Sequence, residues 1–170
     1  GAVDNSKLGD NVLSFSVSDS TGNAATAVHR TVTVIDTTGP VITLKGQATM
    51  LVEVNSFFAD AGATANDFID GDLTADIMSA GTVDTAKPGA YSIKYNVNDK
   101  TGNAAIEVVR TVTVVDNTVP VITLKGEADL TIEAGANYTD AGATATDSTD
   151  GDLTANITVI NPVDTSKLGT

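Results

Sequence analysis

Apolar and polar residues alternate along most of the chain with a period of two, the period of extended strands. The clearest example lies at 91–98, where Tyr91, Ile93, Tyr95 and Val97 alternate with polar residues. Val, Ile and Thr dominate these runs, and such residues favour strands. No segment shows a sustained period of 3.6. The pattern therefore predicts an all-β protein.

Between positions 37 and 116 the pattern predicts five strands, at 41–46, 48–54, 75–80, 90–98 and 104–115. One or two further short strands are expected within 56–66. Arg110, like Arg30, interrupts an apolar strand face, and we interpret this as a twist or bulge with a paired arginine. Short strands separated by turns rich in Gly and Asp are typical of an immunoglobulin-like β-sandwich.

The sequence repeats itself, with a period equal to the interval from Thr38 to Thr118. The segment TGPVITLKG at 38–46 returns as TVPVITLKG at 118–126, and DGDLTA at 70–75 returns at 150–155. Aligning residues 1–90 with 81–170 without gaps gives 48 identities in 90 positions. Such self-similarity is the signature of a repeat architecture, so we expect tandem antiparallel sandwich modules.

Module boundaries are expected where strand-like sequence gives way to a short polar stretch and a proline, before Pro40 and Pro120. With these boundaries, residues 37–116 form one complete module. Residues 1–36 form the C-terminal part of a preceding module, and 117–170 form the N-terminal part of a third. A chain that begins and ends inside modules is expected to be a slice of a longer array.

The recurring motifs resemble those of a known family. They are DTTGPVITLKG at 36–46, DAGATAND at 60–67, DGDLT at 70–74, VDTAKPG at 83–89, DKTGNAA at 99–105 and RTVTV at 110–114. Together they resemble the immunoglobulin-like domain of bacterial surface proteins, which is akin to the hyalin repeat. The resemblance covers the whole chain. It implies a sandwich fold and a spacer or stalk role in large secreted proteins and adhesins, and it carries no catalytic residues to transfer.

Composition narrows the possible partners. Nine basic and 22 acidic residues give a net charge of −13, which argues against nucleic acid and against an anionic membrane surface. No apolar run approaches the length of a membrane span, so no membrane insertion is expected in this segment. The chain has no Cys, and its single His29 is not kept in the repeat. No nucleophile–base pair recurs, so an enzyme is not expected.

Acidic residues concentrate in the predicted loops. If the strands 41–46 and 48–54 run in opposite directions, the loop 56–74 lies at the end of the module that also holds the linker and the turn 99–103. Carboxylates gathered there would repel one another, and calcium binds such oxygen-rich sites without His or Cys. We therefore predict calcium at the module junctions, although turn formation by Asp explains some of these residues. The candidate ligands are Asp36, Asp60, Asp67, Asp70, Asp72, Asp99 and Asn103, and in the third module Asp116, Asp140, Asp147, Asp150 and Asp152.

Two functions remain open at this stage. The first is a structural segment of an extracellular stalk, adhesin or filament, in which neighbouring copies of the repeat join head to tail by strand complementation. The second is a carbohydrate- or ligand-binding accessory module, for which Phe57, Phe58 and Phe68 form the one apolar contact patch in the predicted loops. Either function places the segment outside the cell. A Lys–Asn isopeptide cross-link at Lys45 or Lys125 would require a buried lysine.

Overall fold

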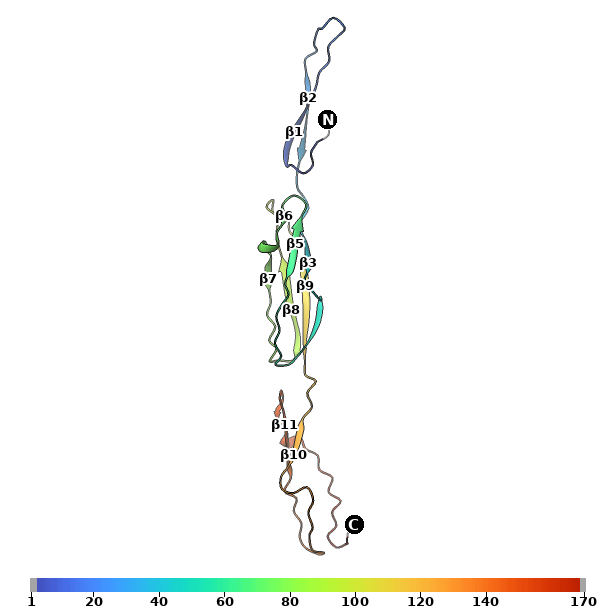
Figure 1. Cartoon of the computed structure of the whole chain (residues 1–170), viewed down its shortest axis with the longest axis vertical. Helices are drawn as coiled ribbons and strands as arrows, with labels where there is room; N and C mark the ends of the chain where they lie inside the picture. The colour runs from blue at the N-terminus through green and yellow to red at the C-terminus, as the bar shows by residue number, and fades with distance from the viewer. Residues whose placement is uncertain (1–2, 169–170) are drawn as a thin grey trace. The chain divides into compact units, whose positions relative to one another are not determined.

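A computed structural model describes residues 3–168 of the chain (Figure 1). The chain forms two compact units, Gly1–Val114 and Val115–Thr170. Every named strand is antiparallel to the neighbour for which a register is defined, and the helical content is confined to two short 3-10 turns. The fold is all-β, as predicted. Within the described residues, no helix is long and apolar enough to cross a membrane.

The first unit begins with a hairpin of β1 (Gly9–Phe15) and β2 (Val28–Val34). The two strands pair along their whole length, from Gly9↔Val34 to Phe15↔Val28. The turn between them is held by Asp19, whose carboxylate accepts hydrogen bonds from Thr21 and Asn23. This hairpin forms a two-stranded sheet of its own.

Two further sheets follow in the first unit. One contains β3 (Val41–Leu44), β5 (Ala63–Asp67) and β6 (Gly71–Asp72) in the order β3-β5-β6. The other contains β4 (Thr49–Glu53), β9 (Val108–Val115), β8 (Gly89–Asn96) and β7 (Met78–Ala80) in the order β4-β9-β8-β7. Figure 1 shows these strands gathered in the middle part of the chain.

The core of the first unit draws on both of these sheets. Ile42, Ala63 and Ala65 come from one sheet, and Ile93 and Tyr95 come from the other. All of them lie at alternate positions of their strands, which send one side chain in two to the same face. Two sheets that share one buried apolar layer make a β-sandwich.

Two details of the predicted strands are wrong. Residues 75–80 begin as the 3-10 turn η1 (Thr74–Asp76) and only then form β7. The turn is required because the chain leaves the β6 sheet and enters the β7 sheet at this point. The last strand starts at Val108 rather than 104, and it runs through Arg110 without a bulge, since Ile93 pairs with Arg110 in a continuous register.

The second unit contains β10 (Val121–Leu124), β11 (Ala143–Asp147) and β12 (Gly151–Asp152), followed by the 3-10 turn η2 (Thr154–Asn156). These elements lie one repeat period after β3, β5, β6 and η1, and they pair in the same order. In this unit the segment equivalent to β4 forms no strand. The apolar side chains of β10 and β11 therefore lack the second sheet that covers their counterparts on β3 and β5 in the first unit.

Candidate functional site

Three of the predicted acidic ligands meet at one end of the sandwich. Asp36 follows β2, Asp67 ends β5, and Asp99 follows β8. Each offers a carboxylate oxygen, and these oxygens all lie within 4.8 Å of one another. Asp67 and Asp99 are buried, with 5% and 7% of their surface exposed. The fold thus brings together acids from three well-separated segments of the chain.

Two of these carboxylates also hold their own turns. Asp67 Oδ1 accepts from the backbone N–H groups of Ile69 and Asp70, at 2.7 and 3.0 Å. Asp99 accepts from the backbone and the side chain of Asn103, both at 2.7 Å, and from Thr101. Burial by itself raises the pKa of Asp99, but these hydrogen bonds outweigh it and leave the pKa below its ordinary value. Turn formation therefore explains part of the cluster, as expected from the Asp residues in the predicted loops.

Turn formation does not account for all of the oxygens in the cluster. Asp36 Oδ1 accepts from the N–H and the hydroxyl of Thr38, whereas Asp36 Oδ2 is buried and has no hydrogen-bond partner. A buried carboxylate oxygen without a donor is costly, and more so beside two other carboxylates. A hard cation would satisfy this oxygen and offset the repulsion.

The second unit assembles a related cluster from Asp116, Asp147 and Asp150. Asp116 and Asp147 lie one repeat period after Asp36 and Asp67 and make the same local hydrogen bonds. Hydrogen bonds from Thr118 lower the pKa of Asp116. This cluster is more exposed than the first, since none of its three members is buried.

The remaining candidates lie outside these two clusters. Asp70 forms an ion pair with Lys100, at 3.1 Å, and accepts from its backbone N–H at 2.8 Å. Asp72 and Asp152 accept from the backbone N–H of Thr74 and Thr154, and hydrogen bonds from the side chains and then the backbones of these threonines lower the pKa values of the two carboxyl groups. Asn103 supports the first cluster indirectly, because its side-chain amide donates to Asp99 and, at 3.4 Å, to the carbonyl of Asp36.

Asp60 is not at the acidic end, and the reason is an error in the predicted strand direction. The end of β4 lies at the opposite end of the sandwich, where the N–H of Asn55 donates to the carbonyl of Thr85 at 2.8 Å. The chain turns back there, so Asp60 lies along the body of the module before β5 begins. Asp140, its equivalent, likewise lies outside the second cluster and accepts from Tyr138 at 3.0 Å.

Asp60 instead forms part of a buried arginine network. Arg110 is wholly buried. Its guanidinium donates to Asp60 and to the carbonyls of Lys45, Gln47 and Gly62. It also lies over the ring of Tyr95, 6.0 Å from the centroid. The predicted pairing of this arginine is confirmed, but its partners could not be identified from the sequence because they lie in distant segments of the chain.

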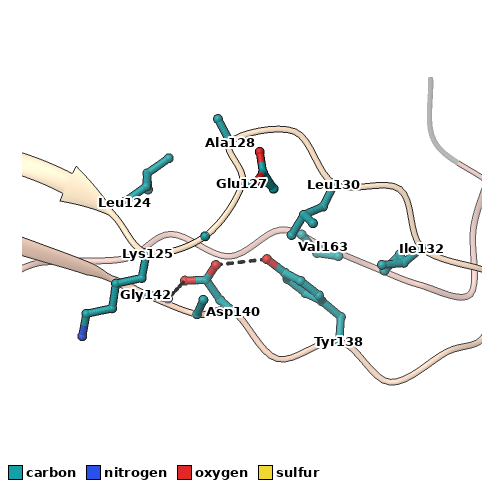
Figure 2. Close-up of a pocket in the computed structure, with 12 residues that line it drawn as sticks. Leu124, Lys125, Glu127, Ala128, Leu130, Ile132, Tyr138, Asp140, Gly142 and Val163 are labelled. Carbon is teal, nitrogen blue, oxygen red and sulfur yellow. Dashed lines mark hydrogen bonds between the residues drawn. The ribbon is translucent and has the colours of Figure 1, made fainter.

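An open pocket of about 520 Å³ lies on the second unit, where the first unit holds this arginine network. Figure 2 shows Tyr138 and Asp140 side by side in it, with Leu130, Ile132 and Val163 around them. Three of the lining residues, Leu124, Tyr138 and Val163, are the counterparts of Leu44, Phe58 and Val83, which pack against the core of the first unit. Elsewhere on the same face, Ile122 is 63% exposed, whereas its counterpart Ile42 is 8% exposed.

The three phenylalanines do not form one contact patch. Phe58 packs against the core, while Phe57 is 91% exposed. Phe68 follows β5 at the acidic end, whereas Phe58 precedes β5, so the whole strand lies between them. Lys45 and Lys125 are both exposed, unlike the buried lysine that an isopeptide bond requires.

The amino-acid sequence of the chain is similar to that of a named bacterial protein. Pesticidal crystal protein Cry22Aa of Bacillus thuringiensis is 36% identical over 137 residues, which are 69% of this chain and 18% of that protein. The chain thus spans less than a fifth of that relative.

Two solved structures align with parts of the chain. Lipoprotein BT2262 from Bacteroides thetaiotaomicron aligns with 47% of this chain and 39% of its own, at 29% identity and a TM-score of 0.42. A structure of CBM51-2 in complex with GlcNAc and INT domains from Clostridium perfringens ZmpB aligns with 52% of this chain and 21% of its own, at 23% identity and a TM-score of 0.37.

The family assignment rests on direct matches to the sequence. A family model described as the Ig-like domain of bacterial surface proteins matches residues 42–114 and again 122–170. These matches cover most of the chain and confirm the resemblance seen in its motifs. The protein belongs to the family of bacterial surface proteins with Ig-like domains.

Proposed function

We propose that this chain is a non-catalytic structural segment of an extracellular bacterial stalk, adhesin or filament. In this proposal its Ig-like modules follow one another, neighbouring copies join head to tail by strand complementation, and calcium stiffens the junctions. Membership of a bacterial surface family supports the extracellular role. A net charge of −13 favours a segment that stays soluble and does not self-associate without specific contacts.

The observation that carries the assembly proposal is that each partial module exposes the residues that the complete module buries. Tyr95 and Val97 are 2% exposed, whereas the equivalent Phe15 and Val17 of the first hairpin are 50% and 69% exposed. On the other side of the same core, Ile122 contrasts with Ile42 in the same way. Exposed core faces favour burial against a matching surface.

Strand complementation would use both faces at once. The β1–β2 hairpin corresponds to β8 and β9, and the second unit corresponds to β3, β5 and β6. A hairpin from one copy would therefore complete the sandwich of another. Such a contact is heterologous, so it propagates from copy to copy into a filament.

The calcium proposal rests on the buried, unpartnered Asp36 Oδ2 beside Asp67 and Asp99. Carboxylate oxygens within 4.8 Å of one another suit a cation that takes several oxygen ligands at once. Asp19 holds its turn as Asp99 does. In a head-to-tail assembly, Asp19 of one copy would therefore join Asp116 and Asp147 of the next, so calcium binding and assembly would favour each other.

The test is the solution mass of the 170-residue chain by light scattering, in millimolar calcium and again after chelation. We expect masses well above the 17.2 kDa of one chain in calcium, and a fall in mass on chelation. A mass of one chain at every protein concentration, in both conditions, would overturn the assembly proposal.

Calcium binding is tested separately by the melting temperature of the chain with calcium and with chelator. A rise in calcium that disappears in Asp67→Asn supports the site. Asp164→Asn serves as the matched control, because Asp164 caps a turn with Ser166, pairs with the exposed Lys167 and lies outside both clusters. A melting temperature that is the same in calcium and in chelator would exclude the calcium site and leave the assembly proposal intact.

A further inference from the structure

We propose that Arg110 is a mechanical lock, which holds the complete module together when the chain is pulled from both sides of it. Such a pull enters the module before β3 and leaves it after β9. The buried guanidinium joins β9 to the segment between β3 and β4, so it resists the sliding of one past the other. This inference goes beyond the proposed function, because it concerns one complete module and needs neither assembly nor calcium.

The chain enters the complete module at its acidic end. Asp36 lies there with Asp67 and Asp99, and its carbonyl accepts from the side chain of Asn103 at 3.4 Å. From this end β3 runs towards the opposite end, because it is antiparallel to β5, which finishes at Asp67. Tension on the segment before β3 therefore pulls this strand towards the acidic end.

The chain leaves the module at the opposite end. β8 finishes shortly before Asp99, and β9 is antiparallel to β8, with Val114 paired to Gly89 at the start of β8. β9 therefore runs away from the acidic end. β4 runs the same way, since it leads to Asn55, which donates to the carbonyl of Thr85 in the turn before β8. β4 and β9 are neighbours in one sheet and are thus parallel.

This arrangement loads the contacts between β9 and the β3–β4 segment all at once. Tension pulls the β3–β4 segment towards the acidic end and β9 towards the other, so the two are driven past each other. The N–H of Thr111 donates to the carbonyl of Ala48 across this boundary at 2.9 Å. Contacts of this kind must give way in one step, whereas strands pulled apart from one end release their hydrogen bonds singly. Forced unfolding is governed by the rate of that step.

Arg110 adds charged hydrogen bonds across the same boundary. Its Nε donates to the carbonyl of Gln47 at 3.0 Å, and its guanidinium also donates to the carbonyl of Lys45. Both acceptors lie between β3 and β4. The guanidinium further binds Asp60 and, at 3.2 Å, the carbonyl of Gly62, so it also holds the segment that leads into β5. Charge-assisted hydrogen bonds are roughly twice as strong as neutral ones.

Burial makes these hydrogen bonds hard to replace while they are stretched. Arg110 is 0% exposed, so water does not reach its donors as the strands begin to slide. An exposed hydrogen bond exchanges its partner for water, whereas a buried charged donor without its acceptors bears the full cost of desolvation. We therefore expect the contacts of Arg110 to persist until the sliding step, so that their removal appears in the unfolding rate.

The test applies tension to single molecules of the 170-residue chain. The chain has no cysteine, so Thr37→Cys and Val119→Cys place handles on either side of the complete module and keep both partial modules out of the path of force. Unfolding of the module should lengthen the molecule by about 200–300 Å. Measurements on isolated molecules in chelator exclude any effect of assembly or calcium.

With these handles, Arg110→Ala should unfold about a hundredfold faster than the wild type at the same force, because its contacts are intact until the sliding step. Leu73→Ala is the matched control, since Leu73 is also buried and its truncation should lower stability in urea by a similar amount. Leu73 lies between the edge strands β6 and β7, on the far side of both sheets from β3 and β4. It should therefore speed forced unfolding by less than about tenfold.

A second pair of handles separates mechanical resistance from general stability. Thr37→Cys combined with Asn98→Cys places both handles at the acidic end, because Asn98 immediately precedes Asp99. Tension then opens the sandwich from that end and releases its contacts in turn. The wild type should unfold at a lower force than with the first pair of handles, and Arg110→Ala should speed unfolding much less.

The conservative variant Arg110→Lys keeps the test decisive if Arg110→Ala does not fold. It retains a positive charge beside Asp60 but lacks the planar fork that reaches several carbonyls, so forced unfolding with the first handles should be about tenfold faster than in the wild type. A wild-type rate for Arg110→Lys in that case, or for Arg110→Ala where it folds, would overturn the proposal.

Two further results would also overturn it. Arg110→Ala could speed unfolding equally with both pairs of handles, or no more than Leu73→Ala does with the first pair. Either result would show that the arginine contributes only general stability. Neither depends on the solution mass that tests assembly, so the mechanical lock and the proposed function can fail separately.

Discussion

The hydroxyl of Tyr95 donates a hydrogen bond of 2.5 Å to Oδ2 of Asp60. The other oxygen of this carboxylate accepts from the buried guanidinium of Arg110. Tyr95 and Arg110 belong to one sheet, whereas Asp60 lies in the segment that leads into the other. The contact therefore ties the two layers of the sandwich together.

Arg110 and Arg30 occupy equivalent positions, but removing each of them should have a very different effect on stability. We expect Arg110→Ala to lower the unfolding free energy of the complete module by about 3 kcal/mol, because it removes the cation paired with Asp60 and the side-chain donor to the carbonyls of Lys45 and Gln47. Arg30→Ala should change it by less than about 0.5 kcal/mol in dilute solution, because Arg30 has no such acceptors within its own chain's hairpin. Urea unfolding at low protein concentration measures both. Equal effects would contradict the network described here.

The tyrosine in this network predicts the alkaline stability of the module. Burial, followed by the hydrogen bond and the negative charge of Asp60, raises the pKa of Tyr95 to about 12 from 10.0. A raised pKa in the folded state means that the folded chain holds this proton more tightly than the unfolded chain. The associated stability is fully present below pH 10 and is lost as the pH rises towards 12.

Melting temperatures between about pH 9 and pH 12 check this expectation. Tyr95→Phe should be less stable at the lower end of this range, because the hydrogen bond to Asp60 is lost. Its melting temperature should also fall less steeply above pH 10, the ordinary pKa of tyrosine. A variant that follows the wild-type slope throughout this range would show that another group controls alkaline unfolding.

Asp36→Asn should have opposite effects with and without calcium. Without the cation, the unpartnered Asp36 Oδ2 faces two other carboxylates, so replacing it with an amide removes repulsion and supplies a donor. We expect the unfolding free energy in chelator to rise by about 1 kcal/mol. In calcium the variant should lose the increase in melting temperature that the wild type gains. Destabilisation in chelator would contradict this account of the cluster.

One position of the proposed head-to-tail joint does not match the complete module, and it gives a further prediction. A side chain at Gly39 would place its Cβ 2.2 Å from the carbonyl oxygen of Ala104, so only glycine fits there. The second unit has Val119 at this position, so a docked hairpin must shift near its Ala24. We expect Val119→Gly to strengthen self-association, by about threefold to tenfold, and Gly39→Ala to lower the melting temperature of the complete module.

Sedimentation equilibrium of Val119→Gly against the wild type measures the change in association. Val121→Thr is a suitable control, because it alters an exposed residue of the same strand region and keeps its β-branched shape. Unchanged association would show that the joint does not bring the hairpin close to Val119.

Much of the fold follows from local pattern. The alternation at 91–98 predicts β8, and the family motifs identify the Ig-like sandwich before any contact is known. The direction of the segment 48–54 could not be obtained in this way. The direction depends on which sheet β4 joins. In the structure β4 joins the sheet of β9 and not that of β3, and strands of similar sequence occur in both sheets. That error moved Asp60 to the wrong end of the module.

By itself, the sequence determined which residues favour strands, which favour turns and which carry charge, because alternation, glycine turns and Asx turns are properties of neighbouring residues. It also predicted that Asp36, Asp67 and Asp99 lie at one end, although it placed Asp67 there through a direction of 48–54 that the structure reverses, and it added Asp60 to the same group. Only the tertiary structure decided that Asp60 binds Arg110, that Asp36 Oδ2 has no partner, and that the second unit leaves Asp140 accessible. These relationships join residues far apart in the chain, and they depend on how two sheets pack rather than on what either sheet prefers alone.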